Sequence, residues 1–118
     1  KPTMINLWFT RCTGCVQEIP VLNELQKRYK RKVNFVAMTF NDETEVQKFL
    51  EKKNFKFHHI TNARSMINEI KTKPYPENIF IDKFGNITHI ERGLPYNENI
   101  DMDAVLEHFE SIIEELLN

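Results

Sequence analysis

Short apolar runs bounded by polar residues predict buried strands along this chain. The first spans residues 4–9, and the second, at 33–40, is rich in β-branched and aromatic side chains. A third run at 55–60 is shorter and predicts a short strand. These three runs are far enough apart for a helix to lie between successive strands.

Two further strands are predicted at 78–82 and 87–91, close together in the sequence. Between them is the stretch DKFGN, in which Gly85 and Asn86 tolerate a positive φ. This arrangement predicts a β-hairpin.

Apolar residues at three- and four-residue spacing predict helices between the strands. One helical face lies within residues 13–30 and is formed by Val16, Ile19, Leu22, Leu25 and Tyr29. Asp42 followed by Glu45 has the pattern of a capping box and opens a second helix. Residues 63–71 predict a short helix, and residues 101–117 predict an amphipathic one.

The order of these elements, β-α-β-α-β-α-β-β-α, predicts the fold class. Strands joined through helices pair in parallel, whereas the closing hairpin adds an antiparallel edge. A three-layer α/β/α sandwich with a mixed central sheet follows. The 118 residues are enough for one core and too few for two, so we expect a single domain over residues 1–118.

The balance of charges bears on the class of partner. The chain has 16 Lys and Arg against 17 Asp and Glu, whereas nucleic-acid binding requires a basic excess. No apolar stretch approaches the ~20 residues that span a bilayer. We therefore expect neither a nucleic-acid partner nor a transmembrane segment in this chain.

The two cysteines, Cys12 and Cys15, fall where the first predicted strand gives way to the first helix. Cys12 at the helix start would meet unpaired N–H groups and the positive end of the dipole, which favour a thiolate. The adjacent Arg11 acts in the same direction. This predicts that Cys12 is an exposed nucleophile that attacks a disulfide, and that the better shielded Cys15 resolves the mixed disulfide.

A C-x-x-C pair also suits zinc, and it can be an inert part of a core. Zinc requires four ligands, and the only other candidates are the neighbours His58 and His59, which would point to opposite faces of a strand. A turn between strand and helix is a poor place for a buried inert pair. Redox chemistry is therefore favoured, without a bound metal or cofactor.

The stretch INLWFTRCTGCVQEIP resembles the thioredoxin superfamily, in its TlpA/ResA-like branch of extracytoplasmic thiol–disulfide oxidoreductases. The branch pattern N-F-W-A-x-W-C-x-x-C-x-x-E-x-P is matched at Asn6, Trp8, Cys12, Cys15, Glu18 and Pro20. YPENIFIDKFGNI resembles the branch segment P-T-x-F-L-I-D-x-x-G-x-I, and the residues after it resemble the closing strand, a glycine (Gly93) and the last helix. The resemblance covers essentially the whole chain and implies a thioredoxin fold.

The resemblance implies a substrate-binding surface made by Trp8, Arg11, Tyr75 and Pro76. Pro76 takes the position of the cis-proline that faces the active site, with Pro74 as the second candidate. Trp8 would shelter the cysteines and shape the contact surface, although ordinary core packing also accounts for it.

Two polar positions of the motif have more than one interpretation. Glu18 is either a surface carboxylate or a proton-handling group near Cys15, and we expect the surface position. Asn6 stands where thioredoxin carries a buried aspartate. Any proton relay for Cys15 must therefore use Glu18, water or another group.

The chain departs from the branch pattern around the motif. Thr-Gly separates the cysteines, Arg11 replaces a tryptophan, and Glu77 with Asn78 replaces threonines. These changes leave the redox poise open. The branch's extra N-terminal hairpin is missing before residue 1, so we expect an upstream hairpin or further domain.

Together these observations predict a reductase of disulfides in extracytoplasmic proteins, in the bacterial periplasm or cell envelope. Its partners would be protein thiols and disulfides and an upstream redox donor protein. A disulfide oxidase or isomerase with the same cysteines is the nearer alternative. A metal-binding or redox-silent domain is the other.

Overall fold

The computed structural model describes residues 1–70, 75–92 and 99–118, and its elements follow the predicted order. The strands are β1 (Thr3–Leu7), β2 (Asn34–Met38), β3 (His58–Ile60), β4 (Glu77–Ile81) and β5 (Ile87–Arg92). The helices are α1 (Thr13–Tyr29), α2 (Glu43–Lys52), α3 (Arg64–Ile70) and α4 (Met102–Leu117).

The five strands form one mixed sheet in the order β3-β2-β1-β4-β5. β1, β2 and β3 are parallel, because α1 and α2 carry the chain back between them. β4 is antiparallel to both β1 and β5. The predicted parallel core with an antiparallel hairpin edge is confirmed.

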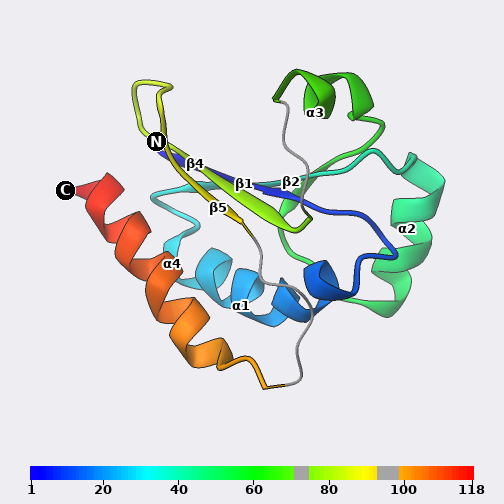
Figure 1. Ribbon diagram of the computed structural model, residues 1–118, viewed down its shortest axis with the longest axis horizontal. Coiled ribbons are helices and arrows are strands. Elements are labelled where there is room, and N and C mark those ends of the chain that lie inside the picture. The colour runs from blue at the N-terminus through cyan, green and yellow to red at the C-terminus, as the bar shows by residue number, and fades with distance from the viewer. Residues whose placement is uncertain (71–74, 93–98) are drawn as a thin grey trace.

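The helices cover both faces of this sheet, and Figure 1 shows α1 and α4 beside one face and α3 beside the other. The larger core joins the sheet to α1, α2 and α4 and includes Trp8, Leu22, Val46, Phe80 and Ile113. The smaller core lies toward α3 and consists of Leu7, Met38, Ala63, Ile67 and Ile79. The three-layer α/β/α sandwich is therefore confirmed.

Local sequence signals set several element boundaries as predicted. Asp42 and Glu45 form a complete capping box at the start of α2. Asp101 caps α4 by accepting from the backbone of Asp103 and Ala104. In the hairpin turn, Gly85 has a φ of 87°, a conformation that favours glycine.

Three strands, β1, β2 and β3, are shorter than the apolar runs that predict them. β1 ends at Leu7 because its partner β4 begins directly after Pro76, which has no backbone N–H with which to continue the ladder. β3 begins only at His58, where it pairs with β2, while the preceding Phe55 and Phe57 are buried in the larger core.

Some predicted features lie outside the described residues. These are the end of the third helix at Lys71, the alternative proline Pro74, and Gly93 after β5. In the part of the chain that the structure describes, no helix has the length and apolar character needed to cross a membrane.

Candidate functional site

The cysteine pair lies at the start of α1, as predicted. Cys12 is the N-cap, and its Sγ accepts a hydrogen bond from the Cys15 backbone N–H at 3.1 Å. The two sulfurs form a disulfide across a Cα–Cα distance of 5.1 Å. The loop before the pair is closed by a bond from the Cys12 N–H to the Phe9 carbonyl at 3.1 Å.

Both cysteines are buried in this oxidised state. Cys12 is 6% exposed and Cys15 is 2% exposed. Cys15 is the better shielded of the two, as predicted. The prediction of an exposed Cys12 is wrong for the disulfide form, because the pair belongs to the larger core cluster. Arg11, directly before Cys12, is exposed.

Trp8 does not reach the surface. Its side chain is fully buried, and its ring lies 5.0 Å from Phe49 and 5.3 Å from Phe55, measured between centroids. The core-packing interpretation of Trp8 is confirmed, and the fully buried indole offers no surface of its own to a partner. Direct contact with a partner needs exposed area, and the loop after β1 turns this indole inward against α2.

Glu18 is buried as well, which overturns the expected surface position. It follows Cys15 by one turn of α1 and is only 8% exposed. Burial raises its pKa from the ordinary value of 4.5 to about 7, although a hydrogen bond from Asn78 opposes the rise. This carboxyl can therefore gain or lose a proton near neutral pH.

Asn78 connects Glu18 to the centre of the sheet. Its Nδ2 donates to the two carboxylate oxygens of Glu18 at 3.3 and 3.5 Å. Its Oδ1 accepts from Asn6 Nδ2 at 2.8 Å. Both asparagines are at most 1% exposed, so this polar track runs through the core from β1 through β4 to α1.

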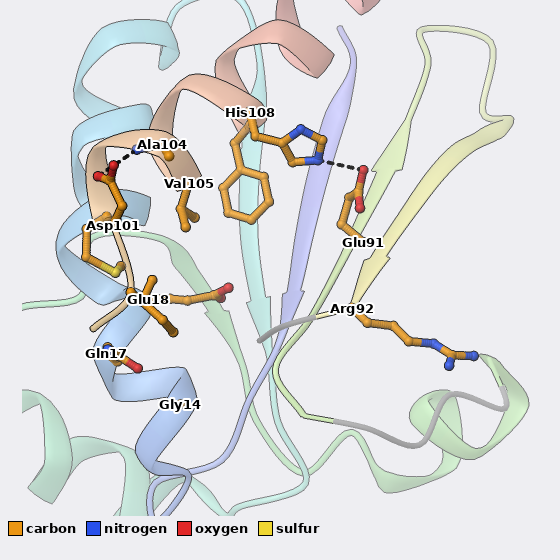
Figure 2. A pocket seen from close by; sticks show the side chains of 12 residues that line it. Gly14, Gln17, Glu18, Glu91, Arg92, Asp101, Ala104, Val105 and His108 are labelled. Carbon is orange, nitrogen blue, oxygen red and sulfur yellow. Dashed lines mark hydrogen bonds and ion pairs between the residues drawn. The ribbon is translucent and has the colours of Figure 1, made fainter. Parts of the chain in front are cut away.

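A cavity of about 420 Å³ lies between α1, β5 and α4 on the same side of the sheet. Figure 2 shows the Glu18 side chain extending from α1 into this space, with Val105 of α4 above it. At the rim, His108 of α4 pairs with Glu91 of β5 at 2.9 Å. Glu18 thus has a route toward solvent that does not pass through the cysteines.

At the edge of the sheet where β1 and β2 end, aromatic rings gather and contact both cores. The Tyr75–Pro76 peptide bond is cis, the isomer that the resemblance implies. The Tyr75 ring lies 5.2 Å from Phe9 and 6.1 Å from Phe40. The guanidinium carbon of Arg64 lies over Phe40, 4.7 Å from the ring centroid.

The described residues bring no three His, Cys, Asp or Glu side chains together as a metal-binding group. His58 is exposed, whereas His59 packs its ring against Trp8 at 5.7 Å. Burial lowers the pKa of His59.

The Redoxin family model matches residues 1–106. The chain belongs to the Redoxin family.

Curated relatives of this Redoxin-family chain include proteins named for thiol–disulfide chemistry. Thiol-disulfide oxidoreductase ResA of Geobacillus kaustophilus is 30% identical over 115 residues, which cover 95% of this chain and 63% of the relative. ResA of Bacillus cereus is 35% identical over 105 residues, covering 86% and 60%. The chain therefore spans less than two thirds of the length of these relatives.

Solved structures share the fold. A putative thiol:disulfide interchange protein DsbE from Chlorobium tepidum has a TM-score of 0.85 at 23% identity, covering all of this chain and 81% of that one. A putative thioredoxin from Neisseria meningitidis has a TM-score of 0.74 at 24% identity, covering 97% and 75%. At these identities the likeness concerns the Redoxin-family fold alone.

Three residues of this site were missed by reasoning from the sequence. Asn78 carried a signal, because it shares a strand face with Phe80 and so places a polar amide on a face that enters the core. Phe40 and Arg64 carried none, because their contact depends on how β2 and α3 pack together.

Proposed function

We propose that this domain is a thiol–disulfide oxidoreductase that reduces disulfides of extracytoplasmic proteins through Cys12 and Cys15. The observation that supports it most is that Cys12 and Cys15, three positions apart, form a disulfide at the N-terminus of α1. The names of the curated relatives agree with this activity.

The reaction begins from the dithiol. The Cys12 thiolate attacks one sulfur of the partner disulfide, a new S–S bond forms, and the partner's other sulfur leaves as a thiolate that takes up a proton. The deprotonated Cys15 then attacks Cys12, which releases the second partner thiolate and closes the Cys12–Cys15 disulfide. Two electrons and two protons pass to the partner. An upstream dithiol protein restores the starting state.

Glu18 is proposed as the group that handles the proton of Cys15. The Cys15 thiol must lose its proton before it can attack, and Glu18 lies one helical turn away. A pKa of about 7 suits a group that accepts and returns a proton near neutral pH. The cavity beside it gives that proton access to solvent.

Arg11, Tyr75 and Pro76 are proposed to contact the partner. Arg11 is exposed beside Cys12, and Tyr75 is partly exposed and packs against both cores. The backbone before a proline remains available to pair with an extended segment of a bound partner. We place the domain in the periplasm or cell envelope on its resemblance to the TlpA/ResA-like branch.

The test is the redox equilibrium of the pair against glutathione and dithiothreitol buffers, followed by thiol trapping. A potential near that of thioredoxin, about −270 mV, supports a reductase. A value near −120 mV indicates a disulfide oxidase instead. If Cys15→Ser fails to trap a mixed disulfide with a protein partner while Cys12→Ser does, the assigned roles of the two cysteines are reversed.

A further inference from the structure

An aromatic cluster, made by Phe9, Phe40 and Tyr75, adjoins the cysteine pair and remains partly exposed. The Phe9 ring stacks on Phe40 at 5.5 Å and meets Tyr75 edge-on at 5.2 Å. Large apolar side chains that are grouped and still accessible are typical of surfaces that bind other proteins.

This cluster is continuous with the disulfide. The Phe9 carbonyl accepts the Cys12 N–H, and the next residue, Thr10, donates its N–H to the Asn41 side chain at 2.9 Å. Tyr75 directly precedes the cis-proline, Pro76. A partner disulfide that reaches Cys12 therefore brings its flanking residues over these rings.

Arg64 gives the cluster a positive charge. Its guanidinium carbon lies 4.7 Å from the Phe40 ring centroid, within the range of a cation–π contact, and the N–H groups of a guanidinium point outward in its own plane. Arg64 is exposed, and no ion pair among residues 1–70, 75–92 and 99–118 includes it.

Among the described residues, two carboxylates near these rings bear on that charge: Glu45, exposed on α2, accepts from Asn41 Nδ2 at 3.2 Å, and Glu77 is buried. Glu77 acts electrostatically on Tyr75, as Arg64 does, but Glu77 is only 2% exposed. Arg11, next to Cys12, is exposed and adds charge of the same sign. A partner therefore meets aromatic surface with the cations Arg64 and Arg11, together with the Glu45 carboxylate, which already accepts a hydrogen bond from Asn41.

We propose that this cluster and Arg64 select partners that carry an acidic residue near the disulfide cysteine, with the partner carboxylate bound to the edge of the Arg64 guanidinium. The path from Phe9 through Phe40 to Arg64 has steps of 5.5 and 4.7 Å. An extended segment covers that path in about three residues, at ~3.3 Å each. The inference rests on the proposed function and deepens it by naming the class of substrate.

The experiment uses two synthetic peptide disulfides that differ only in having Glu or Lys about three residues from each cysteine. Reduced protein is mixed with each peptide, and the second-order rate constant is measured by thiol trapping. We expect the Glu peptide to react roughly 2–5-fold faster at low ionic strength, as for an exposed ion pair. Added salt should shrink that ratio.

Arg64→Gln should bring the ratio close to one. Arg31→Gln is the matched control, because Arg31 is exposed but lies beyond the other end of α1, and it should keep the wild-type ratio. Phe40→Leu, which removes the ring under the guanidinium, should lower the ratio in part. Equal rates for the two peptides in the wild type, or an unchanged ratio in Arg64→Gln, overturn the proposal.

Bis(2-hydroxyethyl) disulfide, which is small and neutral, separates this inference from the proposed function. Wild type and Arg64→Gln should reduce it at equal rates. If the wild type reduces it but shows no preference between the peptides, only the docking inference fails. If the wild type cannot reduce it at all, the proposed function fails, and the inference fails with it.

Discussion

The Glu18 side chain lies in the core, where burial keeps its carboxyl group protonated at pH values at which exposed carboxyl groups are ionised. Its pKa is about 7 in the folded chain against an ordinary 4.5, so the native state binds more protons than the unfolded state between these values. The stability that the neutral form provides is fully present below pH 4.5 and is lost as the pH rises through about 7.

We therefore expect Glu18→Gln to remove a pH dependence. The wild-type free energy of unfolding should fall by about 3 kcal/mol between pH 4.5 and pH 8 relative to the variant, since each pKa unit corresponds to ~1.4 kcal/mol. Urea titrations at a series of pH values measure this difference. Parallel curves for the two proteins would show that Glu18 ionises in the folded state as it does in water.

A substitution at Asn78, which donates a hydrogen bond to Glu18, tests the pKa of the same carboxyl group. Asn78→Leu keeps the volume but removes the donor to Glu18, so the pKa of Glu18 should rise above about 7. The pKa of Glu18 in the variant is obtained by comparing the free energies of unfolding of Asn78→Leu and Asn78→Leu/Glu18→Gln over a range of pH. Asn6→Leu is the control, because it leaves the hydrogen bond from Asn78 to Glu18 in place and should change the pKa of Glu18 less.

At the scale of single residues, the sequence predicted which residues form the disulfide and the cis-proline, but it did not predict what surrounds them. Cys12, Cys15 and Pro76 were found from spacing and resemblance. The burial of Glu18 was not predictable, because the atoms that enclose it come from β4, β5 and α4, more than 55 positions along the chain. The inward turn of Trp8 likewise depends on α2.

Among the secondary-structure elements, α2 has the clearest local code. Asp42 accepts from Glu45 N–H, and Glu45 accepts from Asp42 N–H, at 2.8 and 3.2 Å. Such a cap satisfies N–H groups that the helix itself leaves unpaired. This is why the start of α2 could be read from four residues.

Asp42→Ala should cost about 1 kcal/mol of stability, the usual value for losing an N-cap. In a domain of this size that lowers Tm by about 4 °C. Glu43→Ala is a suitable control, because Glu43 lies in the same turn without a capping bond, and it should change Tm by much less. Equal shifts for the two variants in thermal unfolding would contradict a specific role of the cap.

Strand ends, in contrast, depended on partners rather than on local sequence. The apolar run that predicts a strand over 4–9 continues past Leu7, but the ladder with β4 does not. Periodicity locates a strand, and its neighbours decide how much of it pairs.

For the whole molecule, stability rests on a large core on one side of the sheet and a small one on the other. Trp8 is the largest of the fully buried side chains and joins β1 to α2 within the large core. Its removal should therefore leave a cavity that the surrounding rings cannot fill.

We expect Trp8→Ala to lower the free energy of unfolding by about 3–5 kcal/mol. Phe40→Ala, which truncates a partly exposed ring of the smaller core, should cost less than half as much. Urea denaturation of both variants makes the comparison. A small effect of Trp8→Ala would mean that the indole is not held in the core.

The fold class was predictable at this scale because the order of elements limits the ways in which a mixed sheet can be connected. The positions of the Glu18 cavity and the aromatic cluster were not, because no local pattern reports which side of a sheet a helix covers.

The separate positions of the cavity and the aromatic cluster affect how Glu18 exchanges protons with solvent while a partner is bound. A protein seated over Phe40 and Tyr75 covers residues that pack against the smaller core, whereas the cavity that contains Glu18 is lined by residues of α1, β5 and α4. Water can then exchange with the buried carboxyl while the partner is still attached. The solvent isotope effect on closure of the Cys12–Cys15 disulfide should accordingly be the same for a bulky protein substrate and for a small disulfide.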